Sequence, residues 1–375
     1  MKLQHSAPFE AGRAEEFFNS LPRAPAVFAL WPEPNPAPPT QPYLGRTRNL
    51  RHRLERLLTL PRPGSRRLNL REFARRVDYQ CTGSSFEATW VVYQLNRAHY
   101  PRLYRQRLRL KPPALLKVNL RNRFPRCYPT RRMAHDGSLY YGPFPSRPEA
   151  ERFASEFLDL FKVRRCVEDL EPDPAHPGCI YSQMRMCLAP CFAGCTDTEY
   201  QRELDRAVAF LDSAGLSLGR ELEAERGHAS EALDFEQAAR AHQRLERVHE
   251  VLRRRPALAG NVADLHAVIV ERGAQAMSVV FFRVCGGELY GPAALSLDEK
   301  VASPLPLDQQ LQSVLTALAP AGISAARALP PWEHLALLAR WYYSSFREGE
   351  FVPLKRAAEF PHARLIRICR KLTAA

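Results

Sequence analysis

The chain has 375 residues, of which 45% are hydrophobic, so it is long enough for two or three folded domains with apolar cores. It contains no run of about eighteen apolar residues and no apolar leader near Met1, which argues against a membrane span and against secretion and favours a cytoplasmic protein. The net charge of +14 is concentrated in residues 1–150, where 27 Lys and Arg face 10 Asp and Glu. This excess predicts a polyanionic partner, with nucleic acid first, against the alternative of a solvated Arg-rich surface.

The first predicted elements are two strands and two helices. Residues 24–31 indicate a short buried strand, and residues 42–47 a second strand that pairs with it across a Pro-rich loop. Asn49 is suited to the N-cap of a helix whose leucines at 50, 54, 57 and 58 form one apolar stripe. Residues 61–85 are typical of a polar, basic connection, and residues 85–100 predict a helix that ends before a proline.

Strands follow at residues 114–120 and within 136–144, and an amphipathic helix then leads to the cysteines. Thr196 and Glu199 predict a capping box ahead of a long helix, and Asp234 predicts the cap of a second helix. We expect these two helices to form an antiparallel hairpin or part of one. Beyond it, a period of two over 264–292 predicts a small antiparallel sheet, and the remainder is expected to be mainly helical.

Four cysteines, at positions 166, 179, 187 and 191, lie in one short Pro-rich segment. Disulfides are disfavoured, because cytosolic thiols stay reduced and because nine cysteines cannot all pair. A metal site is the better interpretation, since soft sulfur ligands suit zinc or an iron–sulfur cluster. The spacing C-x12-C-x7-C-x3-C does not name the metal, and scattered structural cysteines remain an alternative. Cys195 is interpreted as a bystander.

Several stretches together resemble the UvrC and Cho-type proteins of bacterial nucleotide excision repair. "DGSLYYGPFPSRPEAERFASEFLDLFKVRRC" and "CIYSQMRMCLAPC" resemble the segments that carry the family's cysteines. "EALDFEQAARAHQRL" resembles the UVR motif, a helical hairpin that meets UvrB. "AVFAL" followed by "YLGRTRNLRHRL" resembles the paired strands and first helix of a GIY-YIG nuclease domain.

The resemblance implies a cofactor, a substrate and a partner. It implies a [4Fe-4S] cluster, with zinc as the alternative, on Cys166, Cys179, Cys187 and Cys191. It also implies DNA as the substrate class, with Mg²⁺ or Mn²⁺ needed only if the nuclease is active. Binding of UvrB is then expected at Leu233, Phe235, Glu236, Ala238, Ala239 and Leu245, where plain packing within a helical linker is the alternative.

The resemblance also places nuclease residues on this chain. Tyr43, Arg46 and Arg53 match catalytic positions, with Arg46 where the family usually has Lys. Four positions depart from the family pattern: Phe28, Leu57, Val92 and Tyr104. Val92 replaces the metal-binding Glu, and an isopropyl group offers no oxygen ligand to a hard divalent ion. For DNA binding we expect Arg46, Arg48, Arg51 and Arg53.

Glu87 lies five residues before Val92 and about 140° round the helix, so we do not expect it to substitute for the missing ligand.

The resulting prediction is an α+β chain of four regions. They are a GIY-YIG-like α/β domain at 20–110, a four-Cys module at 111–195, a helical hairpin with the UVR motif at 196–257, and a small antiparallel sheet with helices at 258–375. The last region resembles the UvrC connecting segment and is expected to hold no RNase H-like nuclease. Two functions follow from the resemblance: a repair protein with an impaired nuclease, or an active Cho-like endonuclease that makes a single-strand incision. A nucleic-acid binder unrelated to excision repair is a third, weaker interpretation.

Overall fold

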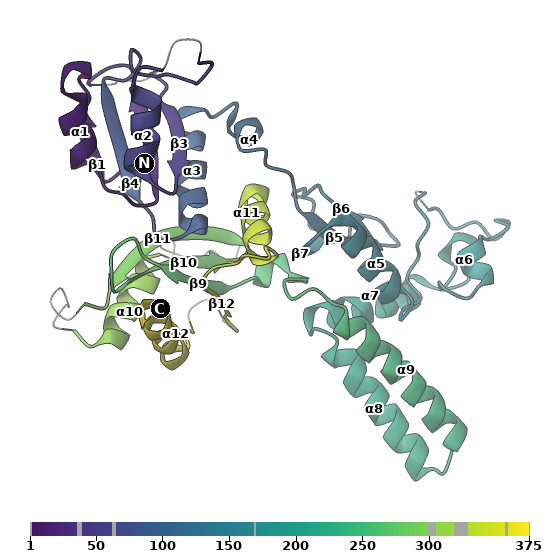
Figure 1. Cartoon of the computed structure of the whole chain (residues 1–375). Coiled ribbons are helices and arrows are strands. Elements are labelled where there is room, and N and C mark those ends of the chain that lie inside the picture. Colours follow the sequence, from purple (N-terminus) through teal and green to yellow (C-terminus); the bar gives the residue numbers. More distant parts are fainter. Residues whose placement is uncertain are drawn as a thin grey trace.

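The computed structural model describes residues 2–35, 40–61, 65–168, 170–298, 305–318, 329–356 and 359–374. Three antiparallel sheets with their helices form an N-terminal unit, a middle unit and a C-terminal unit (Figure 1). The predicted α+β class is confirmed. No helix among the described residues is long and apolar enough to cross a membrane.

The N-terminal sheet has the strand order β1 (His5–Pro8), β4 (Arg76–Cys81), β2 (Ala26–Trp31) and β3 (Tyr43–Thr47). The predicted pairing of β2 with β3 is confirmed, with Phe28 opposite Gly45. A 3₁₀ turn, η1 (Ala11–Arg13), precedes helix α1 (Ala14–Ser20), which packs with α2 (Leu50–Leu58) on one face of the sheet. The Asn49 side chain caps α2 as predicted by accepting a hydrogen bond from the His52 N–H.

The prediction of a connection over residues 61–85 was wrong, because β4 lies inside the N-terminal sheet between β1 and β2. Its sequence hides the strand, since Asp78 and Gln80 are buried polar residues. The Trp31 indole and the Arg76 guanidinium both donate to Asp78, so the buried carboxylate keeps its hydrogen bonds. A polar strand of this kind is stable only where such partners exist.

Helix α3 (Ser85–His99) lies between two sheets. Val91 and Leu95 pack against Val27 of the N-terminal sheet. On the other side Phe86 and Trp90 pack against the C-terminal sheet, where the Trp90 indole donates to the Gly291 carbonyl at 2.7 Å. The helix thus joins the N-terminal and C-terminal units through one shared core element.

A short helix, α4 (Tyr104–Arg107), leads to the middle unit. Its sheet has the order β6 (Arg126–Thr130), β5 (Ala114–Asn119), β7 (Leu139–Phe144) and β8 (Gly260–Asn261). Helices α5 (Arg147–Leu158) and α7 (Asp197–Asp212) cover one face with an aromatic core that includes Phe157 and Phe210. The cysteine-rich loop between these helices contains α6 (Ile180–Gln183) and η2 (Pro190–Phe192).

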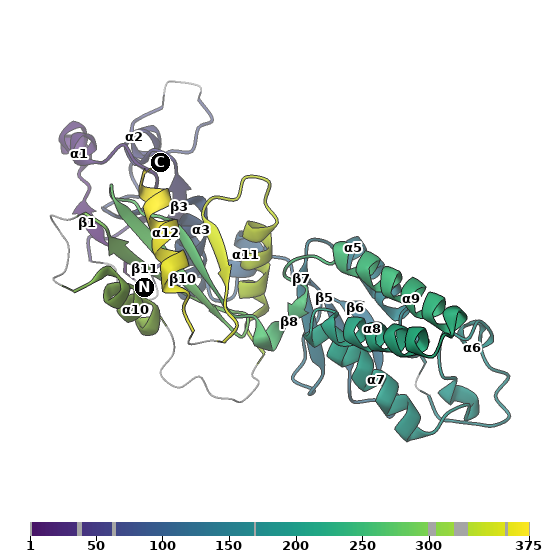
Figure 2. The ribbon, with the colours of Figure 1, turned by 90° about the horizontal axis from the view of Figure 1, so that it is seen from below.

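A hairpin of α8 (Leu216–Glu231) and α9 (Phe235–Arg253) projects from the middle unit, with the two helices side by side in both views (Figures 1 and 2). The predicted capping box of Thr196 and Glu199 is confirmed at α7. The predicted pairing of helices was wrong, because α7 packs in the core of the middle unit and α8 is the partner of α9. The sequence hid α8 because Gly219 and Gly227 weaken its helical pattern.

The C-terminal sheet has the order β11 (Glu288–Ser296), β10 (Ser278–Cys285), β9 (Ala267–Arg272) and β12 (Glu350–Pro353). The antiparallel sheet predicted over 264–292 is confirmed. A 3₁₀ turn, η3 (Val262–Asp264), precedes β9. Helices α10 (Leu307–Ala317) and α12 (His362–Ala374) cover one face, whereas α11 (Trp332–Tyr342) and α3 cover the other.

A buried carboxyl, Glu271, lies where β9 meets the start of α3. Neither of its oxygens has a hydrogen-bond partner of regular geometry, although the Ser84 hydroxyl and the Trp341 indole face it. Burial, with the nearby Glu348 and Glu87, raises the pKa of Glu271 to about 8. The unfolded value is about 4.3, so folding takes up a proton between these pH values. Stability should therefore fall as pH rises from about 4 to 8.

Glu271→Gln should remove this pH dependence. We expect the variant to gain on the native chain as pH rises from 5 to 8, by up to about 1.4 kcal/mol in unfolding free energy per pH unit, and the gain to level off above pH 8. Thermal unfolding at several pH values measures it. The exposed Glu359→Gln, in the same unit, is the control. Parallel curves for Glu271→Gln and the native chain would contradict the assignment.

Candidate functional site

The predicted nuclease residues lie around β2, β3 and α2. Phe28 is fully buried and packs beside Tyr43, with ring centroids 6.3 Å apart. Gly45 is required opposite Phe28, because a Cβ at this position would lie 2.4 Å from the Phe28 ring. The phenyl ring therefore fills the space beside the tyrosine with apolar atoms.

Tyr43 and Arg46 lie on opposite faces of β3. Tyr43 packs on the face that α2 covers, and α2 also carries the half-buried Arg53. Arg46 lies on the other face, where its guanidinium donates to the Thr89 hydroxyl of α3 at 2.7 Å. The fold thus brings Tyr43 and Arg53 to one side of the sheet and leaves Arg46 on the side of α3.

The positions that depart from the family pattern are apolar or engaged elsewhere. Val92 packs beside Val27 and Leu95, and Leu57 is buried in the core beneath α2. The Tyr104 hydroxyl donates to the Glu333 carboxylate at 2.7 Å, and burial together with that carboxylate raises the pKa of Tyr104. Within the described residues no three or more His, Cys, Asp or Glu side chains are grouped so that they could hold a metal ion.

Glu87 has a structural role at the start of α3. It accepts a hydrogen bond from the Gly83 N–H at 2.8 Å, and its own N–H donates to the Ser84 hydroxyl. Burial raises the pKa of Glu87 to about 7, although the Gly83 hydrogen bond lowers it. A carboxyl fixed in this way at the helix start is not directed toward Val92, five residues further along.

A cavity of about 190 Å³ lies beside Arg46. Its walls come from α3 and from α11 of the C-terminal unit, including Thr89, Trp341 and Arg340. Sequence reasoning missed Arg340, because one cation near the end of an amphipathic helix carries no local signal. Contact between the units creates this cavity.

The expected DNA-binding arginines differ in their surroundings. Arg48 is exposed. Arg51 instead donates to the Leu21 carbonyl at 3.1 Å and to the side chain and carbonyl of Asn19, so it fastens α2 to the end of α1. Its donors are occupied within the fold, whereas those of Arg48 face solvent.

The four cysteines gather at one loop. Cys166, Cys179 and Cys191 line a cavity of about 290 Å³ together with Glu168 and His176. Cys187 is buried nearby, and all nine thiols of the chain are free. Burial raises the pKa of both Cys187 and Cys191, with further raising contributions from the neighbouring thiols. Sequence reasoning missed His176, although it lies three residues before Cys179 and its place in the cysteine segment was a signal.

Arg164 anchors this loop to the middle unit and is almost completely buried. Its guanidinium donates to the carbonyls of Phe124 and Glu168 at 2.7 and 2.8 Å and to the Cys166 sulfur at 3.4 Å. A buried guanidinium keeps its charge, so these acceptors are needed for it to be stable there. The four thiols are chemically suited to bind zinc or an iron–sulfur cluster. Among the described residues, however, no three of them lie close enough together to hold one metal ion.

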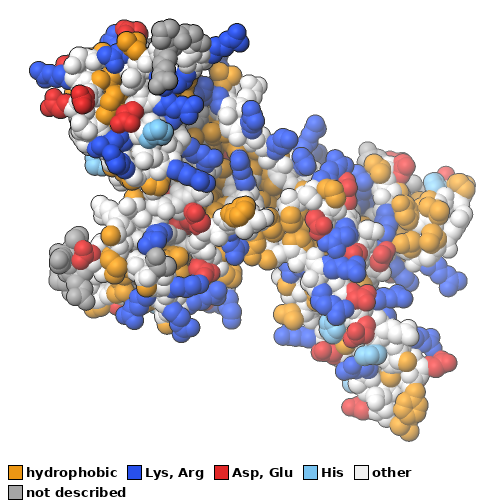
Figure 3. Space-filling model, in the orientation of Figure 1, with side chains coloured by type: hydrophobic (Ala, Val, Ile, Leu, Met, Phe, Trp, Pro, Cys, Tyr) orange, Lys and Arg blue, Asp and Glu red, His pale blue; other side chains and the backbone are white. Residues whose placement is uncertain are grey.

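The residues expected to bind a partner divide into two groups. Leu233 and Phe235 are 71% and 70% exposed at the turn between α8 and α9, and hydrophobic side chains are visible at the end of this hairpin in Figure 3. Leu245 is buried and packs within the middle unit, as the packing alternative predicts. Exposed apolar side chains at a projecting turn are a feature of contact sites.

Comparison with known proteins gives one consistent family. Residues 114–210 match the UvrC/Cho excinuclease middle domain. Relatives named UvrABC system protein C include that of Moorella thermoacetica, 29% identical over 74% of this chain and 44% of the relative. Those of Trichlorobacter lovleyi and Geobacter sp. (strain M21) are 29% and 27% identical over 74% and 76% of this chain and 45% and 43% of the relatives. No solved structure matches.

The chain spans less than half the length of these relatives. Together, the matched middle domain and the longer relatives support a UvrC-like family, as the motifs in the sequence predicted.

Proposed function

We propose that the chain acts in nucleotide excision repair by binding damaged DNA and UvrB, and that its own GIY-YIG nuclease is impaired. The observation that carries the proposal is the similarity to UvrABC system protein C over about three quarters of the chain. The basic N-terminal portion supports DNA as the ligand, since unpaired Arg suits phosphate.

The surroundings of Val92 support the impaired nuclease. A divalent ion needs oxygen ligands, and Val92 instead contacts aliphatic side chains of the N-terminal sheet. Glu87 is held at the start of α3 by Gly83. The retained Tyr43, Arg46 and Arg53 support the alternative, an active Cho-like endonuclease that would need Mg²⁺ or Mn²⁺.

Incision of a lesion-bearing duplex loaded with UvrB separates the two functions. With Mg²⁺ or Mn²⁺ present, we expect no nicking above the level without the chain, because no carboxylate takes the place of Val92. Nicking that disappears in Tyr43→Phe and in Arg53→Ala would contradict the proposal and establish the endonuclease. Gel analysis of an end-labelled strand measures it.

We further propose that the turn between α8 and α9 binds UvrB. Leu233→Ser together with Phe235→Ser should weaken binding of UvrB at least tenfold by removing two exposed apolar contacts, with little change in melting temperature. Leu216→Ser is the matched control, since Leu216 is 60% exposed at the other end of the hairpin. Calorimetry with purified UvrB gives the affinities, and equal losses in both variants would contradict the location.

We also propose that Cys166, Cys179, Cys187 and Cys191 hold a [4Fe-4S] cluster, with zinc as the alternative. A tetrahedral zinc site with bonds of about 2.3 Å needs thiols within about 4 Å of one another. Four cysteines in one loop, of which only Cys187 and Cys191 are close in sequence, suit an iron–sulfur cluster. When bound, such a group would cross-link the loop between α5 and α7 and so stabilise it.

Metal content and absorbance of anaerobically purified protein test the cofactor. We expect about four iron atoms per chain and a broad absorbance band in the visible range. Both the iron and the band should be lost in Cys187→Ser and retained in Cys195→Ser. Cys195 is a partly buried neighbour and so controls for loss of any thiol. Stoichiometric zinc would establish the alternative, and absence of both metals would contradict a metal site.

A further inference from the structure

The segment between Glu87 and Asp136 contains twelve Lys and Arg and no acidic residue. It runs from α3 through α4 into the sheet of the middle unit. Within the described part of the chain only Arg105, Lys117 and Arg123 of the twelve form ion pairs with carboxylates. The other nine have no carboxylate partner there, so their charge is available to an anion from outside.

Six of these cations follow the edge of the middle sheet. Leu115 at the start of β5 pairs with Thr130 at the end of β6. The linker before β5 and the loop after β6 therefore lie at the same end of the sheet. The length of β6, from Arg126 to Thr130, is about 13 Å, so the cations at its two ends are about that far apart. We call the following residues the cationic strip: Arg109, Lys111, Arg121, Arg126, Arg131 and Arg132. Figure 3 shows Lys and Arg side chains gathered over α4, the linker and β6.

An aromatic side chain lies within the strip. Tyr128 is half-buried in β6, opposite Lys117 of β5. The guanidinium of Arg126 lies over its ring, 4.2 Å from the centroid. A positively charged surface that also carries an aromatic side chain is typical of proteins that bind single-stranded nucleic acid.

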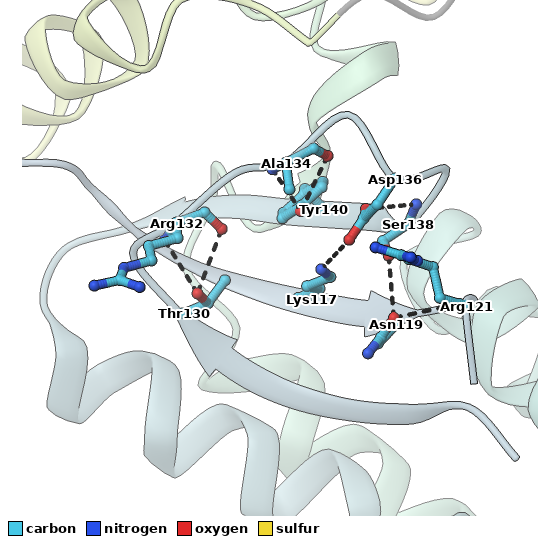
Figure 4. Close-up of polar contacts among 9 residues, drawn as sticks. All are labelled: Lys117, Asn119, Arg121, Thr130, Arg132, Ala134, Asp136, Ser138 and Tyr140. Atoms are coloured by element: carbon cyan, nitrogen blue, oxygen red, sulfur yellow. Dashed lines mark hydrogen bonds and ion pairs between the residues drawn. The ribbon is translucent and has the colours of Figure 1, made fainter. Parts of the chain in front are cut away.

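Residues of β5 and β7 hold the loop that carries Arg131 and Arg132 in place (Figure 4). The Lys117 ammonium and the Asp136 carboxylate form a largely buried ion pair of 2.6 Å, and the Tyr140 hydroxyl accepts from the Ala134 N–H. Burial would raise the pKa of Asp136, but hydrogen bonds from Lys117 and Ser138 hold it at about 2.

The Thr130 hydroxyl also accepts from the Arg132 N–H at 3.0 Å, and Figure 4 shows the Arg132 guanidinium pointing away from these contacts. The loop is thus fixed by groups that leave its arginines uncompensated. These contacts hold the loop backbone within the fold, which favours binding because less of the loop has to be ordered by a ligand.

We propose that the cationic strip binds the phosphodiester backbone of DNA without regard to sequence. The inference rests on the proposed function for the choice of DNA as the polyanion. It adds a second contact surface, separate from Arg48 and Arg53 of the N-terminal unit. The shared chemistry is backbone phosphate, which single-stranded and duplex DNA both supply.

Salt dependence of binding tests the strip on the full chain. Arg131→Gln with Arg132→Gln, and Arg121→Gln with Arg126→Gln, should each lower the slope of log affinity against log salt. The expected drop is about 0.9 per lost contact on duplex DNA and about 0.7 on a single strand. Fluorescence anisotropy with labelled 30-mers of unrelated sequence, single-stranded and duplex, gives the slopes. The form of DNA with the larger drop is the one the strip binds.

Arg147→Gln with Arg152→Gln is the matched control, because α5 lies on the other face of the same sheet and the charge change is equal. Equal loss in the control, or an unchanged slope in both strip variants, overturns the inference. Arg48→Gln with Arg53→Gln then separates the two proposals. If the salt slope falls in Arg48→Gln with Arg53→Gln but not in the strip variants, the proposed function stands and the inference about the strip fails. If the native chain does not bind DNA, the proposed function itself is contradicted.

Discussion

Burial of α3 on two opposite faces is the constraint on which the arrangement of the units depends. Phe86 and Trp90 extend into the C-terminal core, whereas Val91 and Leu95 extend into the N-terminal core. A helix that is apolar on both sides is stable only between two partners. At its start Gly83 approaches the backbone of Arg272 so closely that a Cβ would lie 2.2 Å from that carbonyl oxygen, which fixes the N-terminal unit against the end of β9.

This packing explains the character of the nuclease-like site. The position that would need a carboxylate, Val92, is partly buried and packs against aliphatic side chains, which supply no oxygen ligand to a divalent ion. On the Arg46 side of β3, residues of α3 and α11 line a partly open cavity. Phe28, Leu57 and Val92 therefore share one character, since each presents aliphatic or aromatic carbon to its neighbours, which agrees with the proposed impairment of the nuclease.

The middle unit carries three further features of interest at separate places. Its cysteine-rich loop is anchored by the buried Arg164, and its hairpin presents Leu233 and Phe235 at the far turn. The edge of its sheet carries the cationic strip above the Lys117–Asp136 pair. These three features lie apart from one another on the unit, so each proposed contact can be tested by itself.

Local signals in the sequence determined the elements with strong patterns: the capped α2, the hydrophobic α3, the β2–β3 pair and the four grouped thiols, because each depends on neighbours close along the chain. The motifs likewise determined the family. Only the tertiary structure decided that Asp78 and Gln80 belong to a central strand, that α8 pairs with α9, and that Tyr43 and Arg46 lie on opposite faces. Only it brought Arg340 to the cavity beside Arg46. These features depend on contacts between residues far apart in sequence, which no local pattern encodes.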